Sequence, residues 1–327
     1  MSFGDNNPNA RRSEFDVTDQ IRTTSPVEVG DEVMRLFLDL YPGTASPQIE
    51  RAFNDMRLLY EGRHDDYQAC DTEYHDIQHV LDVTLTMARL LDGYERRRDG
   101  AAPLPPDYFV VGVIAALFHD FGYLLRRNDR KHRYGAEYTL THVSRGAEFL
   151  LHYFPSIGLK RYAAAASQLV HFTGYERSPD TIRLDDPVLR RVGEILGTAD
   201  IIAQMSDRCY LEKCRDRLYP EFVLGGLARR KMPDGQVVTV FESGDDLVRK
   251  TPGFHFNAMK RLDEQLNRAY VYAEKHGGRN VYLEEMDKNM RYAQVTAADS
   301  ERDPLRRTPP ITLPPGPRAY AENLVIV

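Results

Sequence analysis

The chain alternates between stretches in which apolar residues recur at helical spacing and short polar or proline-rich breaks. Recurrence at every third or fourth position is typical of an amphipathic helix with one buried face. Such stretches predict helices at 33–41, 49–62, 75–97, 109–125, 136–154, 160–172, 187–217, 256–276 and 282–294. We therefore expect an all-α fold.

Residues 232–241 (MPDGQVVTVF) carry the one convincing strand signal in the sequence. A Pro-Asp-Gly turn before a β-branched run is typical of a hairpin. We predict a small β-hairpin inserted into the helical fold.

The two ends of the chain differ in composition from its middle. Residues 1–28 are polar and lack periodicity, which predicts a disordered or loosely packed lead. Residues 29–300 are expected to form a single helical domain. Residues 301–327 are rich in proline and predict an extended tail that docks on its own domain or on a neighbour.

The apolar run FVVGVIAALFHDFGYLL (109–125) ends in a histidine and an aspartate, His119 and Asp120. The run is too short for a bilayer, which needs about 20 apolar residues, so it predicts a buried helix. Burying an unpaired charge is costly. A metal ion would satisfy both side chains.

Composition restricts the partners of such a site. The 327 residues carry a net charge of −6, which argues against a nucleic acid polymer or a membrane as the main partner. A small anionic substrate remains open if local cations attract it. Three cysteines without a CxxC pair predict free thiols, and the first thirty residues lack a signal peptide, so we expect a cytoplasmic protein.

Further candidate ligands lie on other predicted helices. In YHDIQH, His75 and His79 are four residues apart and would share a helix face. Separate helices contribute His142, His171 and Asp200. Imidazole and carboxylate ligands suit Fe, Mn, Zn or Mg, and a mixed set around a bridging carboxylate suits two divalent metal ions. The best candidate for that bridge is Asp120.

These residues resemble a known family. The H…HD…D pattern resembles the HD-domain metal-dependent phosphohydrolases, and YHDIQHVLDV is similar to a signature of class I cyclic nucleotide phosphodiesterases. Two features are similar to the bis-metal HD-GYP branch: the Arg-Gly-Ala at 145–147, shortly after His142, and MSDRCY at 205–210. The resemblance covers roughly residues 70–215 and implies an HD-domain helical bundle.

The resemblance also implies roles for individual residues. The ligands of the first metal would be His79, His119, Asp120 and Asp200, the second metal would add His142 and His171, and His75 would protonate the leaving oxygen. The chain departs from both relatives at Tyr123, where they carry histidine or lysine, so we expect Tyr123 to bind substrate. Arg208 follows Asp200 by nearly two helical turns and is a second candidate for facing the cavity.

The predicted function is a phosphodiesterase that hydrolyses a cyclic nucleotide or a related small phosphorylated substrate. A hydroxide that bridges two metals would attack phosphorus, and His75 would act as the general acid. Two alternatives stay open: a di-iron HD-type oxygenase that cleaves a C–C or C–P bond with O₂, and a non-catalytic nucleotide-sensing module. The oxygenases share the metal ligands, but they have no evident task for His75. Alternatively, His75 does not touch the metal or the substrate and only orients one of the metal ligands. A homo-oligomer also stays open.

Overall fold

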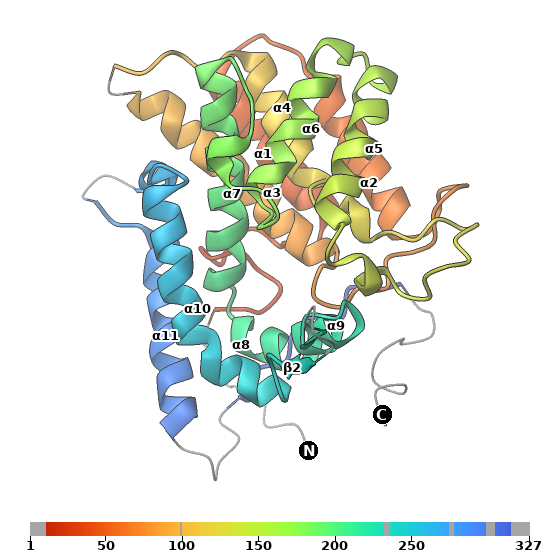
Figure 1. Ribbon diagram of the computed structural model, residues 1–327. Helices are drawn as coiled ribbons and strands as arrows, with labels where there is room; N and C mark the ends of the chain where they lie inside the picture. Colours follow the sequence, from red (N-terminus) through yellow and green to blue (C-terminus); the bar gives the residue numbers. More distant parts are fainter. Residues whose placement is uncertain (1–10, 99, 232–235, 275–277, 299–304, 315–327) are drawn as a thin grey trace.

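The computed structural model describes residues 11–98, 100–231, 236–274, 278–298 and 305–314 (Figure 1). Within these ranges the chain is mostly helical, and its strands form one two-stranded antiparallel sheet. The predicted all-α fold with a small hairpin is confirmed.

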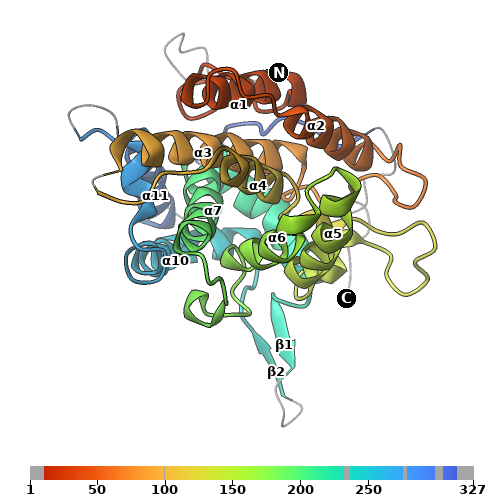
Figure 2. The same cartoon turned by 90° about the horizontal axis from the view of Figure 1, so that it is seen from above.

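The longer helices are α1 (Pro26–Leu40), α2 (Pro47–Tyr60), α3 (Ile77–Arg97), α4 (Pro106–Leu117), α5 (His142–Ser156), α6 (Ala163–Leu169), α7 (Pro187–Ser206), α10 (Gly244–Glu264) and α11 (Val281–Ala298). They lie in layers (Figure 2). Helices α1 and α2 cover one side of α3 and α4, while α6 and α7 pack on the other side and α5 packs on α6. Helices α10 and α11 pack on each other, and α11 also packs on α7.

Shorter helical pieces connect these layers. Single turns of 3-10 helix are η1 (Phe121–Tyr123), η2 (Gly135–Tyr138), η3 (Lys160–Tyr162), η4 (Val170–Phe172), η5 (Pro179–Thr181) and η7 (Ala269–Ala273). After α7 come α8 (Tyr210–Lys213), the π-helix η6 (Cys214–Leu218) and α9 (Tyr219–Leu224).

Helix α4 forms the centre of the core. Every residue from Phe109 to Leu117 is buried, because α4 is enclosed by α2, α3, α6 and α7. A helix that is apolar all round has to be covered on all sides. The apolar run therefore packs as a rigid core element directly before the histidine and aspartate at its end.

Two predicted helices end earlier than expected. Helix α4 ends at Leu117, so His119 and Asp120 lie in a turn rather than on the helix predicted to continue to Leu125. Helix α7 ends at Ser206, because the Asp207 carboxylate accepts from the Cys209 amide at 2.6 Å and so competes with the helix. The helix predicted over 187–217 is thus several short pieces.

The hairpin pairs β1 (Arg229–Lys231) with β2 (Val237–Thr239) in antiparallel register. It projects away from the helical layers (Figure 2). The Pro-Asp-Gly turn predicted from sequence lies at 233–235, outside the described residues.

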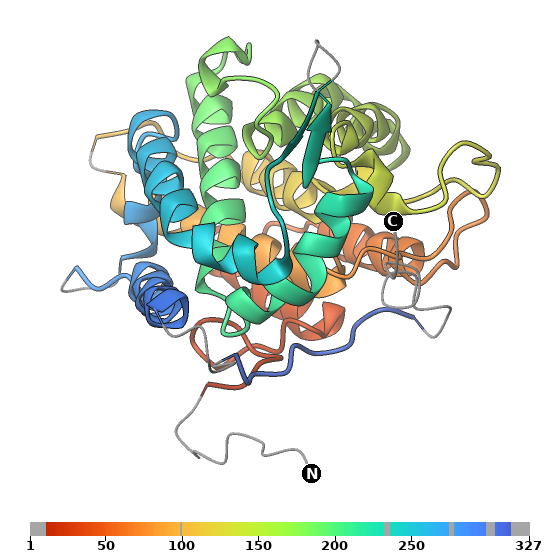
Figure 3. The same cartoon turned by 60° about the horizontal axis from the view of Figure 1, so that its bottom comes forward.

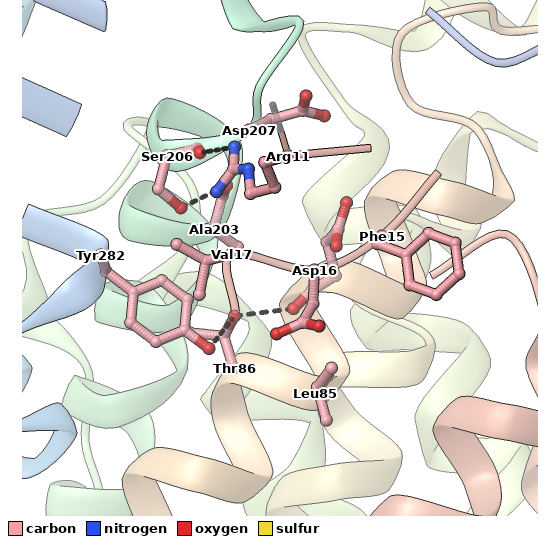
Figure 4. Close-up of a pocket in the computed structure, with 11 residues that line it drawn as sticks. Arg11, Phe15, Asp16, Val17, Leu85, Thr86, Ala203, Ser206, Asp207 and Tyr282 are labelled. Atoms are coloured by element: carbon pink, nitrogen blue, oxygen red, sulfur yellow. Dashed lines mark hydrogen bonds between the residues drawn. The ribbon is translucent and has the colours of Figure 1, made fainter. Parts of the chain in front are cut away.

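The described part of the N-terminal lead, from residue 11 onward, packs on the helices, which corrects the prediction of a loose segment. Asp16 is only 3% exposed and pairs with Arg89 of α3 at 2.7 Å. Arg11 donates to the Ser206 carbonyl at 2.6 Å, and Figure 4 shows Arg11 and Asp16 in one small polar pocket. Buried ion pairs of this kind were not visible as periodicity in the sequence.

The described part of the C-terminal tail, 305–314, runs in extended form along its own chain (Figure 3). Leu305 is 6% exposed. Arg217 donates to the Pro310 carbonyl at 2.6 Å, and the Thr312 hydroxyl donates to the Asp76 carboxylate. Of the two predicted docking partners, this segment contacts the chain's own domain.

The three cysteines, Cys70, Cys209 and Cys214, are buried and free, as their spacing predicted. Among the described residues, no helix combines the length and the apolarity that crossing a membrane requires.

Candidate metal centre

Three buried side chains converge where α3 begins and α4 ends. His79 lies in the first turn of α3, whose N-cap Asp76 accepts from the His79 amide at 2.9 Å. His119 and Asp120 lie in the turn after α4. Ligand atoms of His79, His119 and Asp120 all lie within 4.8 Å of one another.

The ring orientation of His119 turns one of its nitrogens toward the other two side chains of the cluster. Its Nδ1 lies 2.8 Å from the Ala116 carbonyl, which can only accept, so Nδ1 carries the hydrogen and Nε2 presents a lone pair. That Nε2 lies 3.2 Å from Asp120 Oδ2 and 3.3 Å from His79 Nε2. Asp120 Oδ2 is buried and has no hydrogen-bond partner.

Acceptors that face one another in a buried site need a proton or a metal ion between them. Burial lowers the pKa of His119, but the charge of Asp120 outweighs burial and raises this pKa to about 9, so a proton can fill this position. The two imidazoles and the carboxylate could equally hold a metal ion, and this donor set suits Fe, Mn or Zn.

Asp200 of α7 extends the cluster from a third side. Its Oδ1 lies 3.5 Å from His79 Nε2 and 3.8 Å from His119 Nε2. Gln204, one turn later, donates to Asp200 Oδ1 at 3.2 Å and accepts from the Tyr74 hydroxyl at 3.0 Å. These bonds fix the orientation of the Asp200 carboxylate toward the two histidines.

His142 approaches the other oxygen of Asp120. Its Nδ1 donates to the Thr139 carbonyl at 2.7 Å, and its Nε2 lies 3.5 Å from Asp120 Oδ1. Burial lowers the pKa of His142, which favours the neutral ring that metals bind. Asp120 thus has one oxygen facing His79 and His119 and the other facing His142, as a bridging carboxylate requires.

His171 is buried and pairs with a carboxylate. It is 3% exposed on η4, and its Nδ1 lies 3.0 Å from Glu176 Oε1. Of this pair, Glu176 lines the cavity beside His142, and His171 is not among the described lining residues. His171 therefore contacts the cavity-lining Glu176. Glu176 was not among the predicted site residues, and its position five residues after His171 is the only hint that the sequence offers.

His75 has a different partner. It precedes the N-cap of α3, so it does not share a helix with His79 as predicted, although both line one cavity. Its Nδ1 lies 2.5 Å from Glu221 Oε2, and the other oxygen of Glu221 accepts from the Tyr74 amide at 2.7 Å. Glu221 of α9 is fully buried, and no motif in the sequence pointed to it.

Tyr123 lies between two of the histidines. Its ring stacks on His75 and on His142, with ring centroids 4.4 Å apart in each case. It is 2% exposed and lines the cavity. The stack orients the planes of both imidazoles, so Tyr123 contacts the site through these two rings.

A glycine permits the close approach of α5 to this turn. A Cβ added at Gly122 would lie 1.8 Å from the His142 carbonyl. Arg145 of α5 donates to the carbonyls of Gly122 and Leu124. The glycine and the arginine together hold the first turn of α5, which carries His142, against Asp120.

The site opens into a cavity of about 690 Å³. Its lining includes His75, His79, Asp120, His142 and Asp200. Arg208 was predicted to face this cavity from a continuous helix; it follows the break at Asp207 instead and is not among the described lining residues.

These contacts describe a buried His/Asp centre at one end of a large cavity, flanked by a histidine that a carboxylate holds in place. Comparisons with family models, with curated proteins and with solved structures gave no match to this chain.

Proposed function

We propose that the protein is a metal-dependent phosphohydrolase, a phosphodiesterase that acts on a cyclic nucleotide or a related phosphate ester. The observation that carries the proposal is the pairing of His75 with Glu221 beside the His/Asp cluster. A cation site and a proton donor in one cavity are what phosphate ester hydrolysis requires.

Each residue has a task in this proposal. His79, His119, Asp120 and Asp200 would hold the first ion, and Asp120 would share its second oxygen with an ion at His142. Divalent metals supply an activated water and neutralise phosphoryl charge. The chain's own residues fix the cluster, and Tyr123 keeps His75 and His142 in parallel planes.

His75 is suited to donate a proton to the leaving oxygen. With Nδ1 bonded to Glu221, its Nε2 is the free position. Burial lowers the pKa of His75, but the charge of Glu221 outweighs burial and raises the net pKa above the ordinary value. This shift favours the protonated ring, the state that a general acid needs.

The buried free thiols and the absence of CxxC pairs fit a reducing compartment, and we propose the cytoplasm as the place of action. The small substrate would reach the site through the cavity. A second copy of the chain is not needed to complete the cluster.

Activity regained when metal is added back to metal-stripped protein tests this proposal. Mn²⁺, Mg²⁺, Zn²⁺ or Fe²⁺ would be added singly, with a panel of cyclic nucleotides, nucleotides and aryl phosphodiesters. We expect hydrolysis that requires metal and that Asp120→Asn abolishes. Inactivity toward the whole panel with every metal would contradict the proposal and favour oxygen chemistry or sensing.

A further inference from the structure

One part of the cavity lining is built from apolar side chains. They come from α9, the hairpin region and α10, far along the chain from the histidines. The apolar lining comprises Phe222, Leu227, Val240, Phe241, Leu247 and Phe254. The cavity volume of about 690 Å³ is in the range that holds a drug-sized molecule, so it leaves room for a substantial organic group beyond the phosphate.

Two polar groups in this part, Lys250 and Thr251, make hydrogen bonds within the protein. Lys250 donates to Asp246 at 2.7 Å and to the Val240 carbonyl at 2.8 Å. The Thr251 hydroxyl donates to the Leu247 carbonyl at 3.0 Å. A buried polar group on a ligand would lose its bonds to water and find these partners occupied.

Gln204, the glutamine that lines the cavity, is bonded as well. Its amide donates to Asp200 and its carbonyl accepts from Tyr74. Two further polar lining residues, Arg230 and Asn257, are exposed to solvent. A nucleobase lying against the apolar side chains would have few groups to bond, whereas an alkyl or aryl group there would meet matching surface.

We infer that the site takes a phosphate ester whose organic group is apolar, alkyl or aryl, rather than a nucleotide. The inference rests on the proposed function and narrows its substrate class. The phosphate faces the His/Asp centre and His75, and the organic group lies against Phe222, Phe241 and Phe254.

Binding of alkylphosphonates tests the inference without turnover, because they contain no ester bond to hydrolyse. Methyl-, butyl- and octylphosphonate, with adenosine 3′,5′-cyclic monophosphate for comparison, would be titrated calorimetrically into the full chain loaded with Mn²⁺. Each buried methylene can strengthen binding by up to about fourfold. We expect octylphosphonate to bind at least about tenfold more tightly than methylphosphonate and more tightly than the cyclic nucleotide.

Two phenylalanines on α10 give a matched pair of variants. Phe254 lines the cavity and is 44% exposed, whereas Phe256 is 70% exposed and is not among the described lining residues. Phe254→Ser should remove about fivefold or more of the gain from the octyl chain and leave methylphosphonate binding unchanged. Phe256→Ser should change neither.

A Kd that is independent of chain length would overturn the inference, as would tighter binding of the cyclic nucleotide or equal effects of the two variants. The hydrolysis assay and the binding titrations together distinguish a failure of the proposed function from a failure of this inference. If no phosphodiester is hydrolysed while octylphosphonate still binds more tightly through Phe254, the apolar subsite stands and the hydrolase proposal falls.

Discussion

At the scale of single residues, the centre is organised by what each histidine's Nδ1 contacts. Backbone carbonyls of Ala116 and Thr139 fix the tautomers of His119 and His142, so their Nε2 atoms face Asp120 as acceptors. A carboxylate takes that place at His75 and favours its protonated form. Two kinds of partner thus distinguish the histidines proposed to bind metal from the one proposed to donate a proton.

Replacing His75 by alanine tests the role of proton donor. The variant should lose about 10²- to 10⁴-fold in kcat on a phosphodiester with an alkoxide leaving group. It should lose much less on a p-nitrophenyl ester, because nitrophenolate leaves without a proton. Metal content should stay that of the wild type, and His152→Ala, at an exposed position of α5, is the control. Equal losses on both esters would show that His75 is not the acid.

The residues of the His/Asp cluster could be picked out from the sequence, but the residues that contact and orient them could not. His79, His119, Asp120 and Asp200 carried a recognisable order, and the structure brings them within contact distance. Glu221 lies 146 residues from His75 along the chain, and one glutamate among many in a sequence has no local signature. Such partners depend on tertiary packing, which periodicity cannot report.

At the scale of elements, the important contact is that of the turn after α4 with the start of α5. Arg145 binds two carbonyls of this turn, and Gly122 leaves no space for a side chain. The helix that carries His142 is therefore positioned by close backbone approach and by the Arg145 side chain, in addition to side-chain packing such as the stack of Phe149 on Phe121.

Substitution of Gly122 by alanine tests this contact. Because the added Cβ would lie 1.8 Å from the His142 carbonyl, α5 has to move, and we expect a loss of about 1–3 kcal/mol in stability together with weaker metal binding. Gly253→Ala in α10 is the control: its Cβ would have nothing within 4 Å, and alanine favours the helix by about 0.5–1 kcal/mol. Urea unfolding and metal titration give the readouts. Similar behaviour of the two variants would refute the account of the turn.

Helical periodicity predicted which segments are helices but misplaced several of their ends. The ends depend on individual bonds, such as the Asp207 carboxylate that accepts from Cys209 and breaks the helix predicted over 187–217. That break also removed Arg208 from the face on which it was expected. An error in a helix end thus became an error in a predicted site residue.

At the scale of the whole molecule, both terminal segments are part of the folded structure where they are described. Residues near Asp16 pack on α3, and the tail contacts Asp76, the N-cap of the same helix. Helix α3 carries His79, so segments far from the site in sequence support the element that positions a ligand.

Asp16→Asn tests the packing of the N-terminal segment through its pH dependence. Burial raises the pKa of Asp16, but Arg89 and nearby hydrogen bonds outweigh it and lower the pKa from 3.8 to about 2. The ionised carboxylate therefore stabilises the fold above about pH 4, and this contribution is lost as pH falls toward 2. We expect the variant to be less stable by about 2 kcal/mol at pH 7 and by about half of that at pH 3. A difference in the free energy of unfolding that does not change with pH would contradict the ion pair.

The source of the oxygen atom in the product distinguishes hydrolysis at the His/Asp centre from oxygen chemistry. The ester that is hydrolysed fastest would be turned over in H₂¹⁸O under argon, and the mass of the phosphorylated product would be measured by mass spectrometry. We expect one ¹⁸O atom from water in each product molecule and full activity without O₂. Activity that requires O₂, with label entering only from ¹⁸O₂ gas, would contradict it.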